Sequence, residues 1–281
     1  MAKVRLDILV CQQGLAATRE KARALILAGQ IKVDGRRVDK PGTAVDENAL
    51  IEAMSPGCPY VSRGGWKLEK ALDVFGVEVQ DLVVLDVGAS TGGYTDCALQ
   101  RGARRVYAVD VGYGQLDWKL RNDPRVVNME RTNIRYLPTD EFPEPVDLVT
   151  IDVSFISTSF VFPVIKSLLK YEGAVICLIK PQFEAGRDKV GRKGVVRDKD
   201  IHREVLLHSI DHAAQHGLNC LGLTYSPITG PKGNIEFLIH LRQDLLPLAD
   251  IEAEVQRVVD EAHLQLGGKT AHENTTGQQP L

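Results

Sequence analysis

Apolar runs of strand length alternate with stretches of helical periodicity over most of the chain. The strand-like runs are Val83–Val87, Arg105–Val109, Val146–Ile151, Ala174–Ile179 and Phe237–Leu241. Helical stretches lie between most of them, at Trp66–Phe75, Thr95–Gln100, Phe162–Leu169 and Ile201–His216. Strands that alternate with helices predict an α/β fold with a Rossmann-like, doubly wound and mostly parallel sheet.

The first 60 residues follow a different pattern, which predicts a small α+β unit. Helices are expected over residues 5–13 and 19–28, and Thr18 is a suitable N-cap for the second of them. The segment Ser55–Pro59 is rich in turn-forming residues and therefore reads as a linker. A domain boundary is expected there.

The same unit contains a hairpin pattern. Two short strands, 31–33 and 36–38, flank Asp34-Gly35, a pair typical of a type I′ turn, and residues 45–54 supply more strand-like sequence.

The changes of pattern along the chain divide it into three expected parts: residues 1–60 with a linker near 55–60, residues 61–245, and residues 246–281.

The last of these parts carries a helical pattern of its own. Apolar residues recur at Ile251, Val255, Val258, Val259, Ala262 and Leu266. This spacing predicts one amphipathic helix. The polar residues beyond Gly267 are expected to be disordered.

Composition narrows the class of protein. The chain has 281 residues, of which 25% are charged and 44% hydrophobic, and this excludes a fully disordered or fibrous chain. No run approaches the roughly 18–20 apolar residues of a membrane span. No signal peptide is recognisable either, so the expected location is the cytoplasm. Separately, we expect a monomer with no membrane partner. The five cysteines are scattered, which supports neither a disulfide framework nor a thiolate zinc site, and no metal is expected.

Charge is unevenly distributed along the chain. The formal net charge of −3 excludes a uniformly basic coat for nucleic acid. Residues 1–40, however, hold nine Lys and Arg against four acids. This excess predicts a basic docking surface on the first unit, the alternative being an ordinary solvated face.

A Gly-rich turn follows the first strand of the α/β part. It runs from Asp86 through Gly88, Ser90, Gly92 and Gly93 to Tyr94. In a doubly wound fold this is where a nucleotide-like ligand approaches the backbone. The turn has neither the G-x-G-x-x-G spacing nor a phosphate-cradling G-K-[ST]. It resembles motif I of the S-adenosylmethionine-dependent methyltransferases.

That resemblance implies roles for several residues. An acid near the turn, Asp86, can accept from the methionine ammonium of S-adenosylmethionine. Asp110, which ends the second strand, can accept from its ribose. Asn133 occupies the usual place of a residue that faces the adenine, although an Asn that caps a turn explains it nearly as well. A purely structural Gly-rich turn is the alternative for the whole set.

Of four further motifs, one opens the α/β part, two follow its strands and one begins a late strand. They are Ser62-Arg63-Gly64-Gly65-Trp66-Lys67-Leu68, Asp152-Val153-Ser154-Phe155, Ile179-Lys180-Pro181-Gln182-Phe183-Glu184 and Gly233-Asn234-Ile235-Glu236. Polar groups at the carboxyl ends of parallel strands line the ligand crevice. Asp152 and Lys180 both follow apolar runs, where an unpaired charge is costly, so we expect them to pair with each other.

Together these motifs resemble the FtsJ-like ribose 2′-O-methyltransferases, and in particular the TlyA or hemolysin A-like family. Its members join an S4 RNA-binding domain to a class I methyltransferase domain. The S4 resemblance lies in Arg5-Leu6-Asp7, Thr18-Arg19-x-x-Ala22, Gly29-x-Ile31-x-Val33-Asp34-Gly35 and Lys40-Pro41. The family implies S-adenosylmethionine as cofactor and cytidine in ribosomal RNA as substrate. Its Lys-Asp-Lys-Glu tetrad falls on Lys67, Asp152, Lys180 and Glu236.

The tetrad suits the chemistry of a ribose hydroxyl. A 2′-OH is a poor nucleophile until its proton leaves, and a base for this step should titrate near working pH, whereas a free lysine titrates at ~10.4. Burial and a second ammonium both favour a neutral amine. We therefore predict that Lys180 accepts the proton or stabilises the forming alkoxide, and that Asp152 orients it. Lys67 and Glu236 would fix the electrostatics and the ribose. Two structural Lys–acid pairs are the alternative.

Basic residues outside the tetrad are candidates for RNA contacts. On the first unit they are Arg5, Arg19, Lys21, Arg23, Arg36 and Arg37. These would position RNA through its phosphates rather than read its sequence. Arg63 is expected at the mouth of the cleft. Arg192 and Lys193 lie in a basic, Gly-rich stretch that is either a mobile substrate loop or a merely solvated one.

Three other functions compete with ribose methylation. A membrane-active hemolysin would need a signal peptide, a span or a basic amphipathic helix, and none is recognisable. A non-catalytic RNA-binding assembly factor would not need an intact tetrad. A base or protein methyltransferase would often carry N-P-P-Y-like sequence where this chain has Asp152-Val153-Ser154-Phe155.

Overall fold

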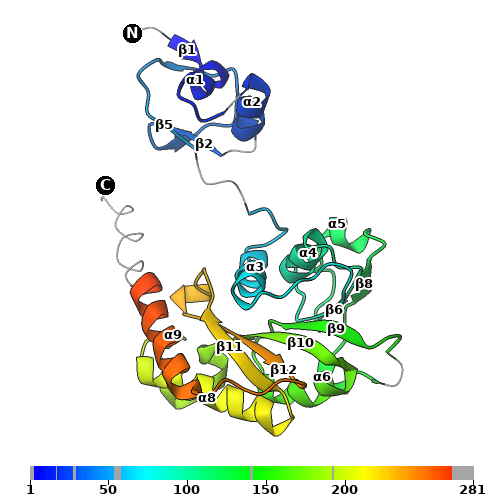
Figure 1. The fold of residues 1–281 in the computed structure, drawn as a ribbon. Coiled ribbons are helices and arrows are strands. Elements are labelled where there is room, and N and C mark those ends of the chain that lie inside the picture. Colours follow the sequence, from blue (N-terminus) through cyan, green and yellow to red (C-terminus); the bar gives the residue numbers. More distant parts are fainter. Residues whose placement is uncertain are drawn as a thin grey trace. The chain divides into compact units, whose positions relative to one another are not determined.

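The computed structural model describes residues 3–16, 18–27, 30–53, 58–139, 142–191 and 193–267. The chain divides into two compact units, Met1–Pro59 and Tyr60–Leu281 (Figure 1). The expected disorder after Gly267 lies outside the described residues.

The first unit packs two helices against short antiparallel strands. Its elements are β1 (Lys3–Arg5), α1 (Leu6–Gln12), α2 (Arg19–Leu27), β2 (Ile31–Val33), β3 (Arg36–Arg37), β4 (Ala44–Asp46) and β5 (Ile51–Ala53). Strand β1 pairs with β4, and β2 pairs with β3 and β5. The core beneath them includes Leu6, Val10, Ile26 and Ile31, all completely buried.

Two local predictions for this unit are confirmed. Asp34 and Gly35 have φ angles of 51° and 76°, and a type I′ turn requires positive φ at both positions. The Thr18 hydroxyl accepts a hydrogen bond from the Lys21 backbone N–H at 3.3 Å, as an N-cap does.

The second unit is built on a seven-stranded sheet of order β11-β12-β10-β9-β6-β7-β8. The strands are β6 (Val83–Val87), β7 (Arg105–Val109), β8 (Val126–Met129), β9 (Val146–Ile151), β10 (Leu169–Ile179), β11 (Asn219–Tyr225) and β12 (Phe237–Arg242). Neighbours are parallel from β10 to β8, whereas β12 is antiparallel to both β10 and β11. The predicted doubly wound, mostly parallel sheet is confirmed.

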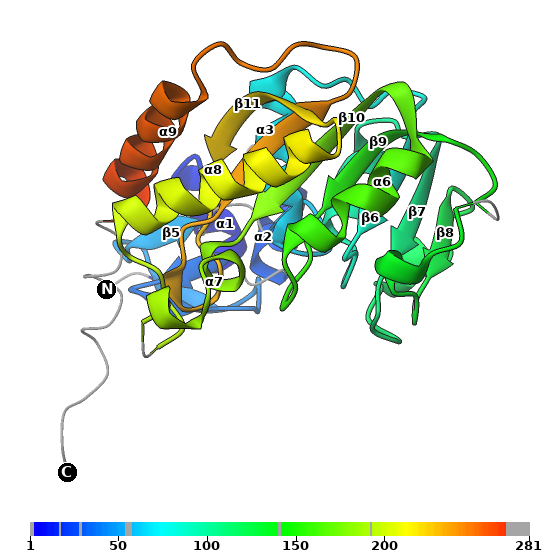
Figure 2. The same ribbon diagram turned by 90° about the horizontal axis from the view of Figure 1, so that it is seen from below.

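Helices cover both faces of this sheet (Figures 1 and 2). They are α3 (Gly64–Phe75), α4 (Gly93–Gln100), α5 (Trp118–Arg121), α6 (Phe162–Leu168), α7 (Pro181–Glu184), α8 (Lys199–Gln215) and α9 (Ile251–Leu266). Short 3-10 helices are η1 (Ile134–Tyr136), η2 (Thr158–Phe160), η3 (Arg187–Lys189) and η4 (Pro231–Gly233). Helices α3 and α4 lie on one face, and α6 and α8 on the other.

The predicted C-terminal helix is confirmed, and it belongs to the core. The residues of α9 at the predicted apolar positions from Val255 to Leu266 are buried in one cluster with Leu206 and Ile210 of α8 and with Leu223 of β11. The amphipathic pattern is therefore explained by packing within this unit.

Candidate functional site

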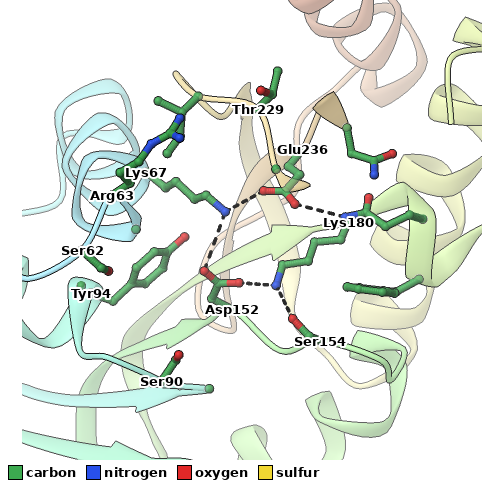
Figure 3. Close-up of a pocket in the computed structure, with 18 of the residues that line it drawn as sticks. Ser62, Arg63, Lys67, Ser90, Tyr94, Asp152, Ser154, Lys180, Thr229 and Glu236 are labelled. Atoms are coloured by element: carbon green, nitrogen blue, oxygen red, sulfur yellow. Dashed lines mark hydrogen bonds and ion pairs between the residues drawn. The ribbon is translucent and has the colours of Figure 1, made fainter. Parts of the chain in front are cut away.

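Polar side chains from distant parts of the sequence meet at the ends of the central strands of the large sheet (Figure 3). Asp152 follows β9 and Lys180 follows β10, and the carboxyl ends of these parallel strands lie side by side. Glu236 precedes β12, which runs the other way, so its start lies beside these ends. The first turn of α3 brings Lys67 to them.

These four residues form a chain of alternating charges. Lys180 Nζ lies 2.5 Å from Oδ1 of Asp152, so the predicted pairing of these two residues is confirmed. Lys67 Nζ lies 3.9 Å from Oδ2 of the same carboxylate and 2.6 Å from Oε2 of Glu236. Asp152 thus lies between two ammonium groups.

Because these charged side chains are largely buried, each of them needs an oppositely charged partner. Glu236 is completely buried, and Lys67 and Lys180 each expose only 8% of their surface. A buried charge without a partner is strongly destabilising, but here two cations face two anions. The tetrad is held together by its own pairing.

Two neighbours that the sequence analysis did not single out complete the network. Lys180 Nζ donates to Oγ of Ser154 at 2.9 Å. Gln182 Nε2 donates to Oε1 of Glu236 at 3.2 Å. Both lie in motifs identified from the sequence, but the pattern gave no signal for the direction of their side chains.

The tetrad lines a cavity of about 950 Å³, and a second cavity of about 370 Å³ adjoins it. Five residues line both, namely Gly88, Ser90, Asp152, Ser154 and Phe155. A ligand in the smaller cavity and one in the larger would therefore meet beside Asp152. This is the geometry of a group transfer between two bound molecules.

The Gly-rich turn separates the two cavities and needs its glycines for space. Gly88 has a φ of +87°, and a Cβ there would lie 2.6 Å from the carbonyl oxygen of Asp152. A Cβ on Gly93 would lie 2.3 Å from the Ser62 hydroxyl. Gly92 has a φ of +95° and faces Leu120 instead of a cavity. Its role is therefore to let the turn pack.

The smaller cavity fits a nucleoside. Its walls include the apolar residues Val111, Ile134 and Ile156. Asp110 lines it as a half-buried carboxylate, held by the Ser90 and Gly112 backbone N–H groups at 2.8 and 2.7 Å. A carboxylate of this kind can accept from ribose hydroxyls.

Asn133 caps a turn, as one of the two interpretations of the sequence predicted, and it also lies in the wall of the smaller cavity. Its Oδ1 accepts from the Arg135 backbone N–H at 3.1 Å, which caps η1. The cap fixes the orientation of the amide at the cavity wall.

Asp86 lies beneath the turn, and the residues that line the two cavities do not include it. Its two oxygens accept from the hydroxyls of Thr95 and Thr150 at 2.6 and 3.1 Å. Burial raises the pKa of this carboxyl to about 6. Asp86 thus ties its own strand to α4 through Thr95 and to β9 through Thr150, a set of partners that the sequence did not indicate.

Tyr94 contributes a buried ring to the wall of the larger cavity. Burial, together with the nearby carboxylates of Asp152 and Glu236, raises the pKa of its hydroxyl well above the ordinary value. The hydroxyl therefore stays protonated.

Phe155 is the most unusual residue of the site. It exposes 87% of its surface, has a φ of +66°, and its ring centroid lies 5.0 Å from that of Phe183. A non-glycine residue seldom adopts this backbone conformation. Because the ring is exposed, it also lacks the stabilisation that a buried aromatic side chain would have. Phe155 lines both cavities.

The basic residues predicted to contact RNA lie at the surface. Arg5, Arg19, Lys21, Arg23, Arg36 and Arg37 are exposed on the first unit. On the second unit Arg63 is exposed and lines the larger cavity, whereas exposed Lys193 lines a separate hollow with Lys189 and Arg197. Arg192 lies outside the described residues.

The sheet, the two adjoining cavities and the tetrad together indicate a methyltransferase. The FtsJ-like methyltransferase family matches residues 60–243, and the S4 domain family matches residues 4–51. The chain belongs to the FtsJ-like methyltransferase family, and the predictions of this family and of S-adenosylmethionine as cofactor are confirmed.

Particular relatives share almost the whole chain. The 16S/23S rRNA (cytidine-2′-O)-methyltransferase TlyA of Mycobacterium tuberculosis is 42% identical over 92% of this chain and 98% of its own. Hemolysin A of Brachyspira hyodysenteriae is 42% identical over 84% of this chain and 99% of its own. A solved structure from Streptococcus thermophilus, described as a candidate hemolysin, is 45% identical with a TM-score of 0.74, and the match covers 96% of this chain and 98% of that one. Among the described residues no helix is long and apolar enough to cross a membrane.

Proposed function

We propose that this protein methylates the ribose 2′-hydroxyl of cytidine in ribosomal RNA, and that Lys180 acts on the proton of that hydroxyl. The observation that carries the proposal is the Lys180–Asp152 ion pair at the junction of the two cavities. The name of the TlyA relative supports the choice of RNA and nucleotide. The reaction is assigned to the cytoplasm.

The tetrad can prepare the hydroxyl in two ways that share one geometry. As a neutral amine, Lys180 accepts the proton of the 2′-oxygen. As an ammonium, it donates to the oxygen while the charge develops. Asp152 and Ser154 hold its Nζ from two sides, at 2.5 and 2.9 Å, so the group is oriented before the substrate arrives.

The other half of the tetrad supports this pair. Lys67 forms ion pairs with both Asp152 and Glu236. The position of Asp152 is therefore set by Lys67 as well as by Lys180. We propose that Asp110 and Asn133 hold the nucleoside part of the cofactor, and their position in the wall of the smaller cavity supports this. S-adenosylmethionine, when bound, would supply a methyl group on a positively charged sulfur, so that a bond from the ribose oxygen to the methyl carbon would replace the carbon–sulfur bond and S-adenosylhomocysteine would leave.

The aromatic pair at the cavity mouth suits a nucleotide substrate. Phe155 lines both cavities and packs against Phe183. Exposed aromatic rings stack on nucleobases with a gain of about 1–3 kcal/mol per base. We propose that the base of the target nucleotide stacks here while its ribose reaches Lys180.

The test is transfer of labelled methyl from S-adenosylmethionine to ribosomal RNA and to isolated subunits, with Lys180→Met beside wild type. Lys166→Met, at an exposed lysine of α6, is the matched control. We expect wild type and the control to label RNA and Lys180→Met to lose at least about 100-fold in rate, the lower range for loss of acid–base catalysis. Full activity in Lys180→Met with normal cofactor binding would refute the role of Lys180. Absence of label with every protein, despite RNA binding, would favour an assembly factor.

A further inference from the structure

The first unit contains a buried carboxylate that holds two exposed arginines. Asp7, in the first turn of α1, has a completely buried side chain. Nε and Nη2 of Arg5 donate to its Oδ1 and Oδ2, both at 3.0 Å, and Nε of Arg19 donates to Oδ2 at 3.0 Å. One anion therefore organises two guanidinium groups from separate elements.

The backbone fixes this carboxylate firmly. The Asp7 N–H donates to the Pro41 carbonyl at 3.0 Å, and the Leu6 N–H donates to the Thr43 carbonyl at 2.9 Å. A Cβ on Gly42 would lie 3.3 Å from Nη1 of Arg5, so the same turn packs closely against that guanidinium. Arg5 is thus braced by Asp7 and by the turn.

The two arginines still face solvent. Their side chains are 50% and 52% exposed, whereas the carboxylate between them is hidden. The three hydrogen bonds to Asp7 do not use Nη1 of Arg5 or either terminal nitrogen of Arg19. Guanidinium groups present planar forks of N–H donors that match phosphate oxygens. Two guanidinium groups around one carboxylate give this exposed face a net positive charge.

We propose that Arg5 and Arg19 form one phosphate-binding site for the RNA backbone, and that Asp7 is the positioning residue that orders it before RNA binds. The proposal rests on the proposed function, since it names the surface that holds the RNA substrate. Ordering a long side chain costs entropy on binding, and a group that is already held avoids that cost. A buried anion beneath a cationic site therefore strengthens binding although its charge opposes it.

This proposal can be separated from simple charge effects because the two predict opposite signs. Neutralising an acid on an RNA-binding surface should tighten binding, because less negative charge repels the phosphates. If Asp7 positions the arginines, Asp7→Asn should weaken binding instead. Asp39→Asn makes the same change of charge at an exposed acid of the same unit and is the matched control.

The experiment measures binding of the full chain to purified bacterial 23S rRNA, without cofactor, over a series of salt concentrations. We expect Asp7→Asn to bind about 5- to 20-fold more weakly, and Asp39→Asn to bind at least as tightly as wild type. Arg19→Lys keeps the charge and loses the fork, so it should weaken binding several-fold with an unchanged salt dependence.

The outcomes distinguish this proposal from the function on which it rests. Asp7→Asn that keeps its helical circular dichroism and binds as tightly as wild type, or more tightly, would overturn the proposal. If Asp7→Asn does not fold, Arg19→Lys decides, and binding within twofold of wild type would overturn it. Lack of methyl transfer together with the expected binding order would refute the proposed function and leave the phosphate site standing.

Discussion

Removing Lys67 should destabilise the second unit strongly, because it leaves a buried anion without its partner. In Lys67→Met the carboxylate of Glu236 loses the ammonium at 2.6 Å and keeps, among the described side chains, the neutral Gln182 amide at 3.2 Å. Breaking a buried ion pair on one side costs about 3–5 kcal/mol. The midpoint of thermal unfolding should fall by roughly 6–20 °C, at about 2–4 °C per kcal/mol for a unit of this size.

A second substitution should restore the stability but not the activity. Glu236→Gln removes the stranded charge and keeps the volume, and Asp152 still has Lys180 at 2.5 Å. We expect Lys67→Met/Glu236→Gln to recover to within about 1–2 kcal/mol of wild type, since neutral replacement of a buried pair is often tolerated. Methyl transfer should stay low in both variants because Asp152 has lost its second ammonium.

Tryptophan fluorescence can follow this unfolding selectively. Both tryptophans, Trp66 and Trp118, belong to the second unit, so the signal reports on that unit alone. A loss of less than about 1 kcal/mol in Lys67→Met, or a double variant no more stable than the single one, would refute the reasoning that the tetrad is a mutually dependent buried network.

Three further predictions concern single residues. Asp86 has a pKa of about 6 in the folded protein against about 3.9 when unfolded, so its contribution to stability is lost as pH rises from 4 to 6. Asp86→Asn should therefore raise the free energy of unfolding at pH 8 by up to about 3 kcal/mol, and no gain in urea denaturation would contradict this. Burial lowers the pKa of His202 to about 4, so the contribution of this residue to stability should fall by roughly 3 kcal/mol as pH drops from 6.5 to 4. The difference in free energy of unfolding between wild type and His202→Leu should shift by that amount in favour of His202→Leu, and a difference that does not change with pH would contradict the assignment. Phe155→Ala should lower kcat/KM for RNA about 5- to 150-fold at unchanged thermal stability, and equal kinetics would exclude stacking.

Much of the fold follows from local patterns in the sequence. The central strands β6, β7 and β9 have their predicted ends because both of their faces are buried, which requires continuous apolar runs. The edge strands β8 and β11 were not among the predicted runs. Neither is fully buried, and each carries polar or glycine residues such as Asn128 and Gly222, so the apolar signal is broken.

Contacts within the candidate site could be predicted from the sequence only where they follow from the charge of a residue and its position at the end of a strand. The pairing of Asp152 with Lys180 follows from the cost of isolating either charge near the ends of adjacent strands. The contacts of Ser154 and Gln182 depend on side-chain directions set by tertiary packing. The partners of Asp86 depend on Thr150 of a neighbouring strand, which no local motif indicates.

The central claim is that the methyl group goes to a ribose oxygen, and the chemistry of the labelled RNA tests it directly. A 2′-O-methyl group blocks alkaline cleavage of the adjacent phosphodiester, because that cleavage needs the free hydroxyl. After wild-type protein has labelled ribosomal RNA, alkaline hydrolysis should leave the label in dinucleotides that begin with cytidine. Label in mononucleotides with a methylated base would contradict the assignment of the tetrad to ribose chemistry.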